Sequence, residues 1–274
     1  MFGAIIGDIA GSVYEWHNIK TKYFPLFGER NFFTDDTVMT IATADALMNG
    51  GEADDFIDAY KKWGRQYPNA GYSGRFGSWL NNDSCEPYNS WGNGSAMRVS
   101  PCAEFAFRSF YSSGSPQASI DHAHELAKIS ANVTHNHTEG IKGAEAVAYA
   151  QMMCYCYGDT EIVKEHIREE ISAIFGYDLS RTLDEIRPTY KFNESCQDTV
   201  PQAIIAFLES TDFEDAIRNA ISLGGDSDTL SAITGGIAEA AYGIPQWIKD
   251  KAWTYLNEPL KEVCQRWQVY IKGN

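Results

Sequence analysis

The chain has 274 residues, a formal net charge of −15 and 44% hydrophobic residues. This length is enough for a generous hydrophobic core, and the apolar fraction is that of an ordinary globular protein. Because the chain is strongly acidic, we expect neither a nucleic-acid backbone nor an anionic membrane as a direct partner. A small anionic ligand is not excluded, since a bound metal would supply local positive charge.

The N-terminal sequence Met1-Phe-Gly-Ala-Ile-Ile-Gly-Asp8 lacks a basic region, and the chain has no run of about 18 apolar residues. We therefore expect neither a signal peptide nor a membrane-spanning helix. The six cysteines show no CxxC spacing and no zinc-finger pattern. We interpret them as reduced thiols of a cytoplasmic protein.

Gly3, Gly7 and Gly11 recur at every fourth position near the N-terminus and give a predicted helix one smooth side. Asp8 and Glu15 are seven residues apart, which is nearly two helical turns, so we expect both on one face of this helix. Taken alone, the pair is more typical of a closely packed helix with two exposed acids than of a functional site.

Helical periodicity continues along the chain, whereas strand-like alternation is scarce. Residues 36–49 end at two glycines, and residues 52–63 begin with acids and end at Gly64, as helices do. Similar patterns cover residues 117–130, 138–157, 160–173, 199–209, 212–223, 228–242 and 246–270. We predict a compact all-α fold that forms a single domain over residues 1–274.

Two acidic clusters, Thr34-Asp-Asp-Thr37 and Gly224-Gly-Asp-Ser-Asp-Thr229, each open directly into a predicted helix. A single Asp-Thr step is most often a helix cap, but a cap needs only one side-chain acceptor and each cluster offers several. Carboxylates this close repel one another and need a cation or a raised pKa, and Mg²⁺, Mn²⁺ and Ca²⁺ prefer such oxygen ligands. The clusters therefore predict a binuclear metal site if the fold brings them together. An EF-hand is excluded, because the later Gly and Glu of that loop are missing.

Residues 64–95 and 175–196 interrupt the helical pattern, and loops of this length are often functional. In the segment Gly92-Asn-Gly-Ser-Ala-Met-Arg98 the glycines leave backbone N–H groups free to cradle phosphate, although a simple turn explains them too. The same two alternatives hold for His135 and His137, which either contact a ligand or metal or are ordinary hydrogen-bonded histidines.

In chain order, five pieces resemble the ADP-ribosylglycohydrolase family, of the dinitrogenase reductase-activating glycohydrolase and ADP-ribosyl-acceptor hydrolase type. They are Gly3-Ala-Ile-Ile-Gly-Asp-Ile-Ala-Gly-Ser-Val-Tyr-Glu15, Phe33-Thr-Asp-Asp-Thr37, Gly92-Asn-Gly-Ser-Ala-Met-Arg98, Thr134-His135 and Gly224-Gly-Asp-Ser-Asp-Thr229. The pieces extend over nearly the whole chain.

This resemblance implies a compact orthogonal helical bundle around a central binuclear site for two Mg²⁺ or Mn²⁺ ions. It implies metal ligands at Thr34, Asp35, Asp36, Asp226, Asp228 and Thr229. Glu15 and Asp36 are the candidate catalytic groups, since a carboxylate beside the metals can transfer a proton. The ADP-ribose-binding residues would be Ser90, Trp91, Gly92, Asn93, Gly94, Met97 and His135. For Trp91, contact with adenosine and a buried structural role are both open.

The function implied is a metal-dependent hydrolase that removes ADP-ribose from a protein side chain such as arginine or serine, or from a small-molecule acceptor. Alternatives are hydrolysis of O-acetyl-ADP-ribose or poly-ADP-ribose, and a non-catalytic ADP-ribose-binding or structural member. The complete set of acids favours an enzyme. The sequence is compatible with a monomer.

Overall fold

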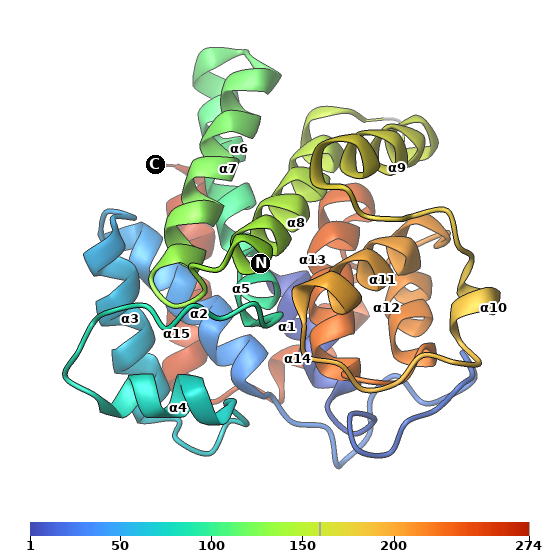
Figure 1. Cartoon of the computed structure of the whole chain (residues 1–274), viewed down its shortest axis with the longest axis horizontal. Helices are drawn as coiled ribbons and strands as arrows, with labels where there is room; N and C mark the ends of the chain where they lie inside the picture. The colour runs from blue at the N-terminus through green and yellow to red at the C-terminus, as the bar shows by residue number, and fades with distance from the viewer. Residues whose placement is uncertain (159, 274) are drawn as a thin grey trace.

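The structure, a computed structural model, describes residues 1–158 and 160–273, without the side chains of residues 109–113. Within these residues the chain is all-α: no strand is formed, and one isolated β-bridge joins Gly92 to Ser195. Helices cross one another at steep angles around a common centre (Figure 1). The predicted all-α bundle is confirmed.

The described helices have the following bounds. They are α1 (Phe2–Gly11), α2 (Asp35–Asn49), α3 (Ala53–Gln66), α4 (Gly74–Asn81), α5 (Gly94–Met97), α6 (Ser100–Ser113), α7 (Pro116–Asn132), α8 (Thr138–Cys156), α9 (Thr160–Phe175), α10 (Leu183–Ile186), α11 (Cys196–Leu208), α12 (Phe213–Ser222), α13 (Ser227–Tyr242), α14 (Gln246–Trp253) and α15 (Glu258–Lys272). The hydrophobic core draws on residues from Met1 to Trp267. That the chain forms a single domain stays a prediction.

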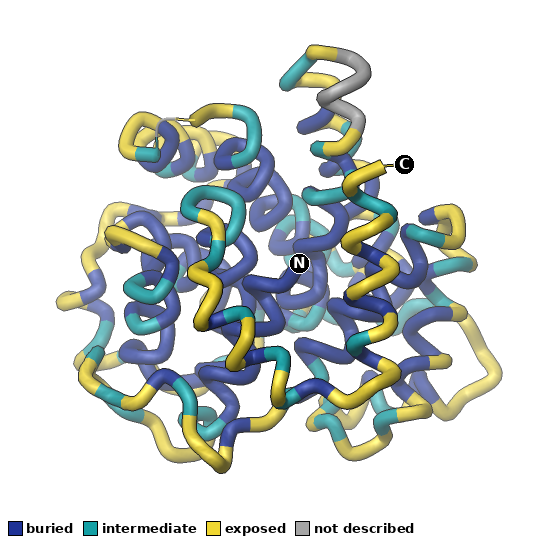
Figure 2. The backbone as a smooth tube through the Cα atoms, turned by 180° about the vertical axis from the view of Figure 1, so that it is seen from behind, coloured by how far each residue is buried: buried dark blue, intermediate teal, exposed yellow. Residues whose placement is uncertain are grey.

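Helices α1 and α13 pack against each other at the centre with unusually close backbones. A Cβ on Gly7 would lie 1.9 Å from the carbonyl oxygen of Ser231, and one on Gly3 would lie 2.2 Å from that of Gly235. The Ser231 hydroxyl also donates to the Gly7 carbonyl at 2.7 Å. The smooth side predicted for α1 is therefore the face that lets α13 approach. In Figure 2 the backbone is buried through the middle of the molecule and exposed along the outer loops.

Helix α1 ends at Gly11, where the Ser12 N–H bonds the Asp8 carbonyl at 2.8 Å. Our expectation that Asp8 and Glu15 share one helix is therefore wrong, because Glu15 lies in the turn that follows. The turn folds back toward the helix: the Asn18 amide donates to the carbonyl of Glu15 at 2.8 Å. The two carboxylates fall in different close groups, both of which include Asp228, and the charge of Asp8 acts on Glu15.

Four helices were not predicted: α4, α5, α6 and α10. Helix α4 lies inside the 64–95 stretch, where the Ser73 hydroxyl caps its first turn and Phe76, Trp79 and Leu80 bury one face. A helix of this length presents only two apolar turns, so its periodicity is weak in the sequence. The remaining predicted helices are present with ends shifted by a few residues, and the 246–270 pattern is divided at residues 254–257 into α14 and α15.

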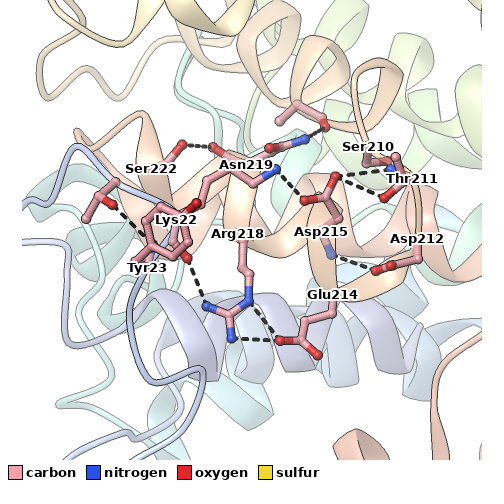
Figure 3. Close-up of polar contacts among 12 residues, drawn as sticks. Lys22, Tyr23, Ser210, Thr211, Asp212, Glu214, Asp215, Arg218, Asn219 and Ser222 are labelled. Atoms are coloured by element: carbon pink, nitrogen blue, oxygen red, sulfur yellow. Dashed lines mark hydrogen bonds and ion pairs between the residues drawn. The ribbon is translucent and has the colours of Figure 1, made fainter.

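The segment between α1 and α2 is anchored to α12 (Figure 3). The Arg218 guanidinium donates to the carbonyls of Lys22 at 3.0 Å and Phe24 at 2.7 Å, while its Nε contacts Glu214 at 2.8 Å. The Lys22 ammonium forms an ion pair with Asp215. These contacts fix the loop that begins with Glu15.

The six cysteines all lie in the described residues and none is in a disulfide. Among the described helices, none combines the length and the apolar character needed to cross a membrane.

Candidate metal centre and ligand cavity

A cavity of about 820 Å³ lies where the two acidic clusters meet the 64–95 stretch and the residues that follow it. Every residue that the sequence analysis placed in the site lines this cavity: Glu15, Thr34, Asp35, Asp36, Ser90, Trp91, Gly92, Asn93, Gly94, Met97, His135, Asp226, Asp228 and Thr229. The structure thus brings together side chains from segments far apart in the sequence. Their individual roles stay predictions.

The first acidic cluster is held in place by Asp8. Thr34 is the N-cap of α2, and the Asp8 carboxylate accepts bonds from the Thr34 N–H at 2.9 Å, the Thr34 hydroxyl at 2.6 Å and the Thr37 N–H at 3.0 Å. A carboxylate at the N-terminus of a helix satisfies its free N–H groups and interacts favourably with its dipole. Asp8 therefore orients the turn that carries Asp35 and Asp36.

The second cluster is shaped by two glycines with positive φ, Gly224 at +67° and Gly225 at +75°, a conformation that favours glycine. The Asn18 side chain bonds both backbone groups of Gly225, at 2.8 Å and 2.9 Å. The turn delivers Asp226 to the start of α13, where its carboxylate accepts a bond from the Asn93 amide at 2.7 Å. One predicted ADP-ribose-binding residue therefore contacts one predicted metal ligand.

The two clusters meet across the cavity. The Thr229 hydroxyl donates to Asp36 Oδ2 at 3.2 Å. Carboxylate oxygens of Asp8, Asp36 and Asp228 lie within 4.8 Å of one another, and so do those of Glu15, Asp226 and Asp228. Asp228 belongs to both groups, which is an arrangement suited to two cations that share a ligand.

We call these six acids the acidic centre: Asp8, Glu15, Asp35, Asp36, Asp226 and Asp228. Burial, followed by neighbouring carboxylates, raises the pKa of Asp35, Asp36 and Asp228 well above the usual range. Burial also raises the pKa of Asp226. It raises the pKa of Asp8 to about 6 and, with the charges of Asp226 and Asp8, that of Glu15 to about 7.

The acidic centre fits a bound cation. Among the described residues, no Lys or Arg forms an ion pair with any of its members. Asp36 Oδ1 is buried and has no hydrogen-bond partner in that part of the chain. Buried carboxylates without compensation are unfavourable, and a hard divalent ion with oxygen ligands removes the penalty.

The cavity lining also contains two arginines and a histidine: Arg75, Arg98 and His135. Arg98 is fully buried, its guanidinium lies 4.1 Å from the ring centre of Tyr60, and it donates to the Ser130 carbonyl at 2.9 Å. Burial, with the charges of Arg98 and Arg75, lowers the pKa of His135 well below its usual range. The ring is therefore neutral at physiological pH.

Exposed aromatic side chains border the cavity. Trp16 is 74% exposed, Phe32 is 52% exposed and Trp91 is 48% exposed. Trp16 stacks on Phe192 with ring centres 5.2 Å apart, whereas Trp91 meets His137 edge to face at 5.7 Å. The alternative of a buried structural Trp91 is therefore wrong.

Sequence reasoning missed three contributors to the site: Asp8, which belongs to the acidic centre, and Arg75 and Arg98, which line the cavity. Asp8 was noticed as an acid but not placed in the site, although a charged residue in an otherwise apolar, glycine-rich helix is itself a signal. Arg98 stands in the 92–98 segment but has no role in the sequence analysis, and it has no carboxylate partner among the described residues. Arg75 carries no local sequence signal, because its place depends on how the 64–95 stretch folds.

The fold is all-α, and its two acidic helix starts meet at a cavity where they form carboxylate clusters that could hold a metal ion. The chain belongs to the ADP-ribosylglycohydrolase family, whose model matches residues 1–270. It is therefore a glycohydrolase.

Curated relatives agree with this assignment. The chain is 28% identical to ADP-ribosylhydrolase ARH3 of Mus musculus, over 89% of this chain and 83% of that protein. It is 25% identical to the ADP-ribosylarginine hydrolase Tri1 of Pseudomonas putida, over 93% of this chain and 73% of that protein. It is also 25% identical to the ADP-ribosyl-[dinitrogen reductase] glycohydrolase of Rhodospirillum rubrum, over 77% and 69%.

A solved structure described as an ADP-ribosylglycohydrolase-related protein complex has the same fold. It matches with a TM-score of 0.66 and 22% identity, over 95% of this chain and 93% of that chain.

Proposed function

We propose that this protein removes ADP-ribose from an acceptor in a reaction that depends on divalent cations held by the acidic centre. One observation carries the proposal: the carboxylates of Asp36 and Asp228 meet at a cavity whose lining also contains Arg75, Arg98 and His135. A lining with both a carboxylate cluster and guanidinium groups suits a ligand that carries an anionic diphosphate as well as a ribosyl bond. Membership of the ADP-ribosylglycohydrolase family supports the same substrate class.

Two Mg²⁺ or Mn²⁺ ions would be held by Thr34, Asp35, Asp36, Asp226, Asp228 and Thr229. When bound, such ions orient ribose hydroxyls and make a water molecule more acidic. Asp8 would orient these ligands and not bind the ions itself, because its oxygens already accept three hydrogen bonds from Thr34 and Thr37. Asn93 supports Asp226 in the same way, through the bond from its amide.

Of the two candidate catalytic carboxylates, Glu15 and Asp36, Glu15 is better suited to proton transfer. It is only half-buried and it lines the cavity, so its carboxylate is accessible to a water molecule or a leaving group. Without bound cations, burial and the charges of Asp226 and Asp8 raise its pKa to about 7. Asp36 is buried and accepts a hydrogen bond from Thr229, which suits a metal-ligating side chain. Cleavage of the ribosyl bond builds positive charge on the sugar, which the surrounding carboxylates stabilise.

The exposed part of the cavity lining favours a cationic acceptor. Glu194 is exposed and lines the cavity, and burial, followed by the charge of Asp226, raises its pKa. Glu194 and Glu15 offer two carboxylates, and the stacked Trp16–Phe192 pair offers aromatic faces. Both kinds of group suit a planar guanidinium. We therefore place arginine first among acceptors. Serine, a small molecule, O-acetyl-ADP-ribose and poly-ADP-ribose follow it.

The test is release of free ADP-ribose from ADP-ribosyl-arginine, an ADP-ribosyl-serine peptide and O-acetyl-ADP-ribose, each with Mg²⁺, Mn²⁺ or EDTA. The proposal predicts EDTA-sensitive turnover that is fastest on the arginine substrate. It also predicts that Glu194→Gln reduces the preference for arginine over serine. ADP-ribose binding without turnover on any substrate would instead support a non-catalytic binding protein.

A further inference from the structure

A hydrogen-bonded chain of three side chains runs from the buried core to the ligand cavity. Arg98 Nη2 donates to the Thr134 hydroxyl at 2.8 Å, and that hydroxyl lies 2.8 Å from His135 Nδ1. Thr134 is fully buried, and His135 is 5% exposed. Neither Arg98 nor Thr134 has a role in the metal centre, and Arg98 has no carboxylate partner among the described residues.

The direction of each bond follows from the chemistry of the groups. A guanidinium has only donors, so the Thr134 oxygen must accept from Arg98. The Thr134 hydroxyl proton then needs an acceptor, and His135 Nδ1 is the one that the described part of the chain offers. If Nδ1 carried a proton instead, the buried Thr134 proton would be left without a partner, which is unfavourable.

The other edge of the imidazole faces the cavity. His135 Nε2 lies 3.2 Å from the position of a Cβ on Gly94 and 3.6 Å from that of one on Gly92, and all three residues line the cavity. The ring is neutral, as described above, so one nitrogen carries a proton and the other does not. With Nδ1 accepting from Thr134, the proton is on Nε2.

We propose that Thr134, held by Arg98, is a positioning residue that fixes His135 as an Nε2–H donor aimed at an anionic oxygen of the ligand. Arg98 contributes in two ways. It orients the Thr134 hydroxyl, and its buried charge, uncompensated by any carboxylate among the described residues, strengthens the chain of donors. The ligand chemistry that fits is a phosphate oxygen of the diphosphate, since a neutral imidazole N–H and a buried cation both favour negative charge. The ligand part of this inference rests on the proposed function.

The tautomer can be measured without substrate. Long-range proton–nitrogen spectra of nitrogen-labelled protein distinguish protonated from unprotonated ring nitrogens, and the His135 signals among the six histidines are identified by their loss in His135→Gln. We call the hydrogen-bonded chain Arg98–Thr134–His135 the relay. It predicts a single neutral Nε2–H tautomer of His135 in the wild type. It predicts a mixture of tautomers in Thr134→Val, which keeps the shape but lacks the hydroxyl, and the wild-type spectrum in Thr134→Ser. A wild-type ring protonated on Nδ1 would overturn the proposal.

Ligand binding tests the consequence. With Mg²⁺ present, calorimetry should show that Thr134→Val weakens ADP-ribose binding by about ten-fold or more, while Thr134→Ser stays close to the wild type. In turnover, Thr134→Val should raise KM and leave kcat nearly unchanged, because the bond that breaks lies at the acidic centre. In a His135→Gln background, where no tautomer exists, the Thr134→Val substitution should have little further effect. Full addition of the two losses, or an unchanged affinity in Thr134→Val, would contradict the relay.

The two proposals fail in distinguishable ways. If the wild type shows the Nε2–H tautomer and binds ADP-ribose but no substrate is cleaved, the hydrolase assignment fails and the relay stands. If substrate is cleaved but His135 is protonated on Nδ1, the relay fails and the hydrolase assignment stands.

Discussion

Thr229 donates a hydrogen bond to Asp36 at 3.2 Å, although the two residues are 193 positions apart in the chain. This contact joins the two acidic clusters, and it exists because α1 and α13 approach so closely that the starts of α2 and α13 face each other. The position of the candidate metal centre is thus a consequence of the glycine positions on α1.

Asp228 belongs to both groups of close carboxylates, so its loss should affect every cation in the centre. We expect Asp228→Asn to weaken Mn²⁺ binding by at least about ten-fold, measured by electron paramagnetic resonance of free Mn²⁺, and to remove most turnover. Asp58→Asn, an exposed substitution on α3, is the control and should leave both unchanged. Wild-type Mn²⁺ affinity together with full activity in Asp228→Asn would exclude Asp228 as a ligand.

The pH dependence of stability should reverse when metal is added. Folding raises the pKa of Asp8 from 3.8 to about 6 and that of Glu15 from 4.5 to about 7, so the folded protein binds these protons more tightly than the unfolded chain. Their stabilising contribution is complete at low pH and is lost as the pH rises through about 6 to 7. We therefore expect the Tm of EDTA-treated protein to fall between about pH 5 and about pH 8.

Addition of Mg²⁺ or Mn²⁺ should raise the Tm most at the higher pH, because the cation binds the ionised carboxylates. The matching measurement is a thermal melt at each pH with and without metal. A metal-free Tm that rises steadily across this range would argue against uncompensated acids in the centre.

Gly7 tests the close approach of α1 and α13. Because a Cβ at this position would meet the Ser231 carbonyl oxygen at 1.9 Å, Gly7→Ala must push the helices apart. We expect a loss of about 2 kcal/mol or more in the free energy of unfolding, measured with urea. Gly77→Ala on α4, where a Cβ has no neighbour within 4 Å, should be neutral or stabilising by about 0.5–1 kcal/mol. Equal stability of the two variants would contradict the observed packing.

Trp91 lines the cavity while nearly half of it is exposed, so it can offer a ring face to a base. We expect Trp91→Ala to weaken ADP-ribose binding by about 1–3 kcal/mol without lowering the Tm, by calorimetry and thermal melts. Trp247→Ala removes an equally exposed tryptophan outside the cavity lining and should not change binding. Unchanged affinity in Trp91→Ala would assign the adenosine contact to another residue.

Most of the helices and both acidic clusters could be predicted from the sequence, because each is a local pattern with a physical cause. Asp36 and Asp228 belong to clusters that no single helix cap requires, and that excess of acids indicated that the two clusters meet, as the structure shows; their binding of metal stays a prediction. The contact partners were not readable. The turn that carries Glu15 back toward Asp8 depends on Asn18 and Gly225, which are 207 positions apart.

The role of Arg98 was equally hidden, since nothing near it in the sequence indicates a buried cation next to Thr134. Its partners come from α7 and the turn that follows it, 32 and 36 positions along the chain. The sequence therefore indicated which groups the site contains, whereas the packing of α1, α7 and α13 decided which of them touch.

A single titration tests whether cations in the acidic centre carry the hydrolysis. EDTA-treated protein is mixed with increasing Mn²⁺, and bound Mn²⁺ and release of ADP-ribose from ADP-ribosyl-arginine are measured in the same samples. We expect no turnover without metal and a rate that rises with occupancy until the centre is filled. Full turnover in samples that contain no bound Mn²⁺ would contradict it.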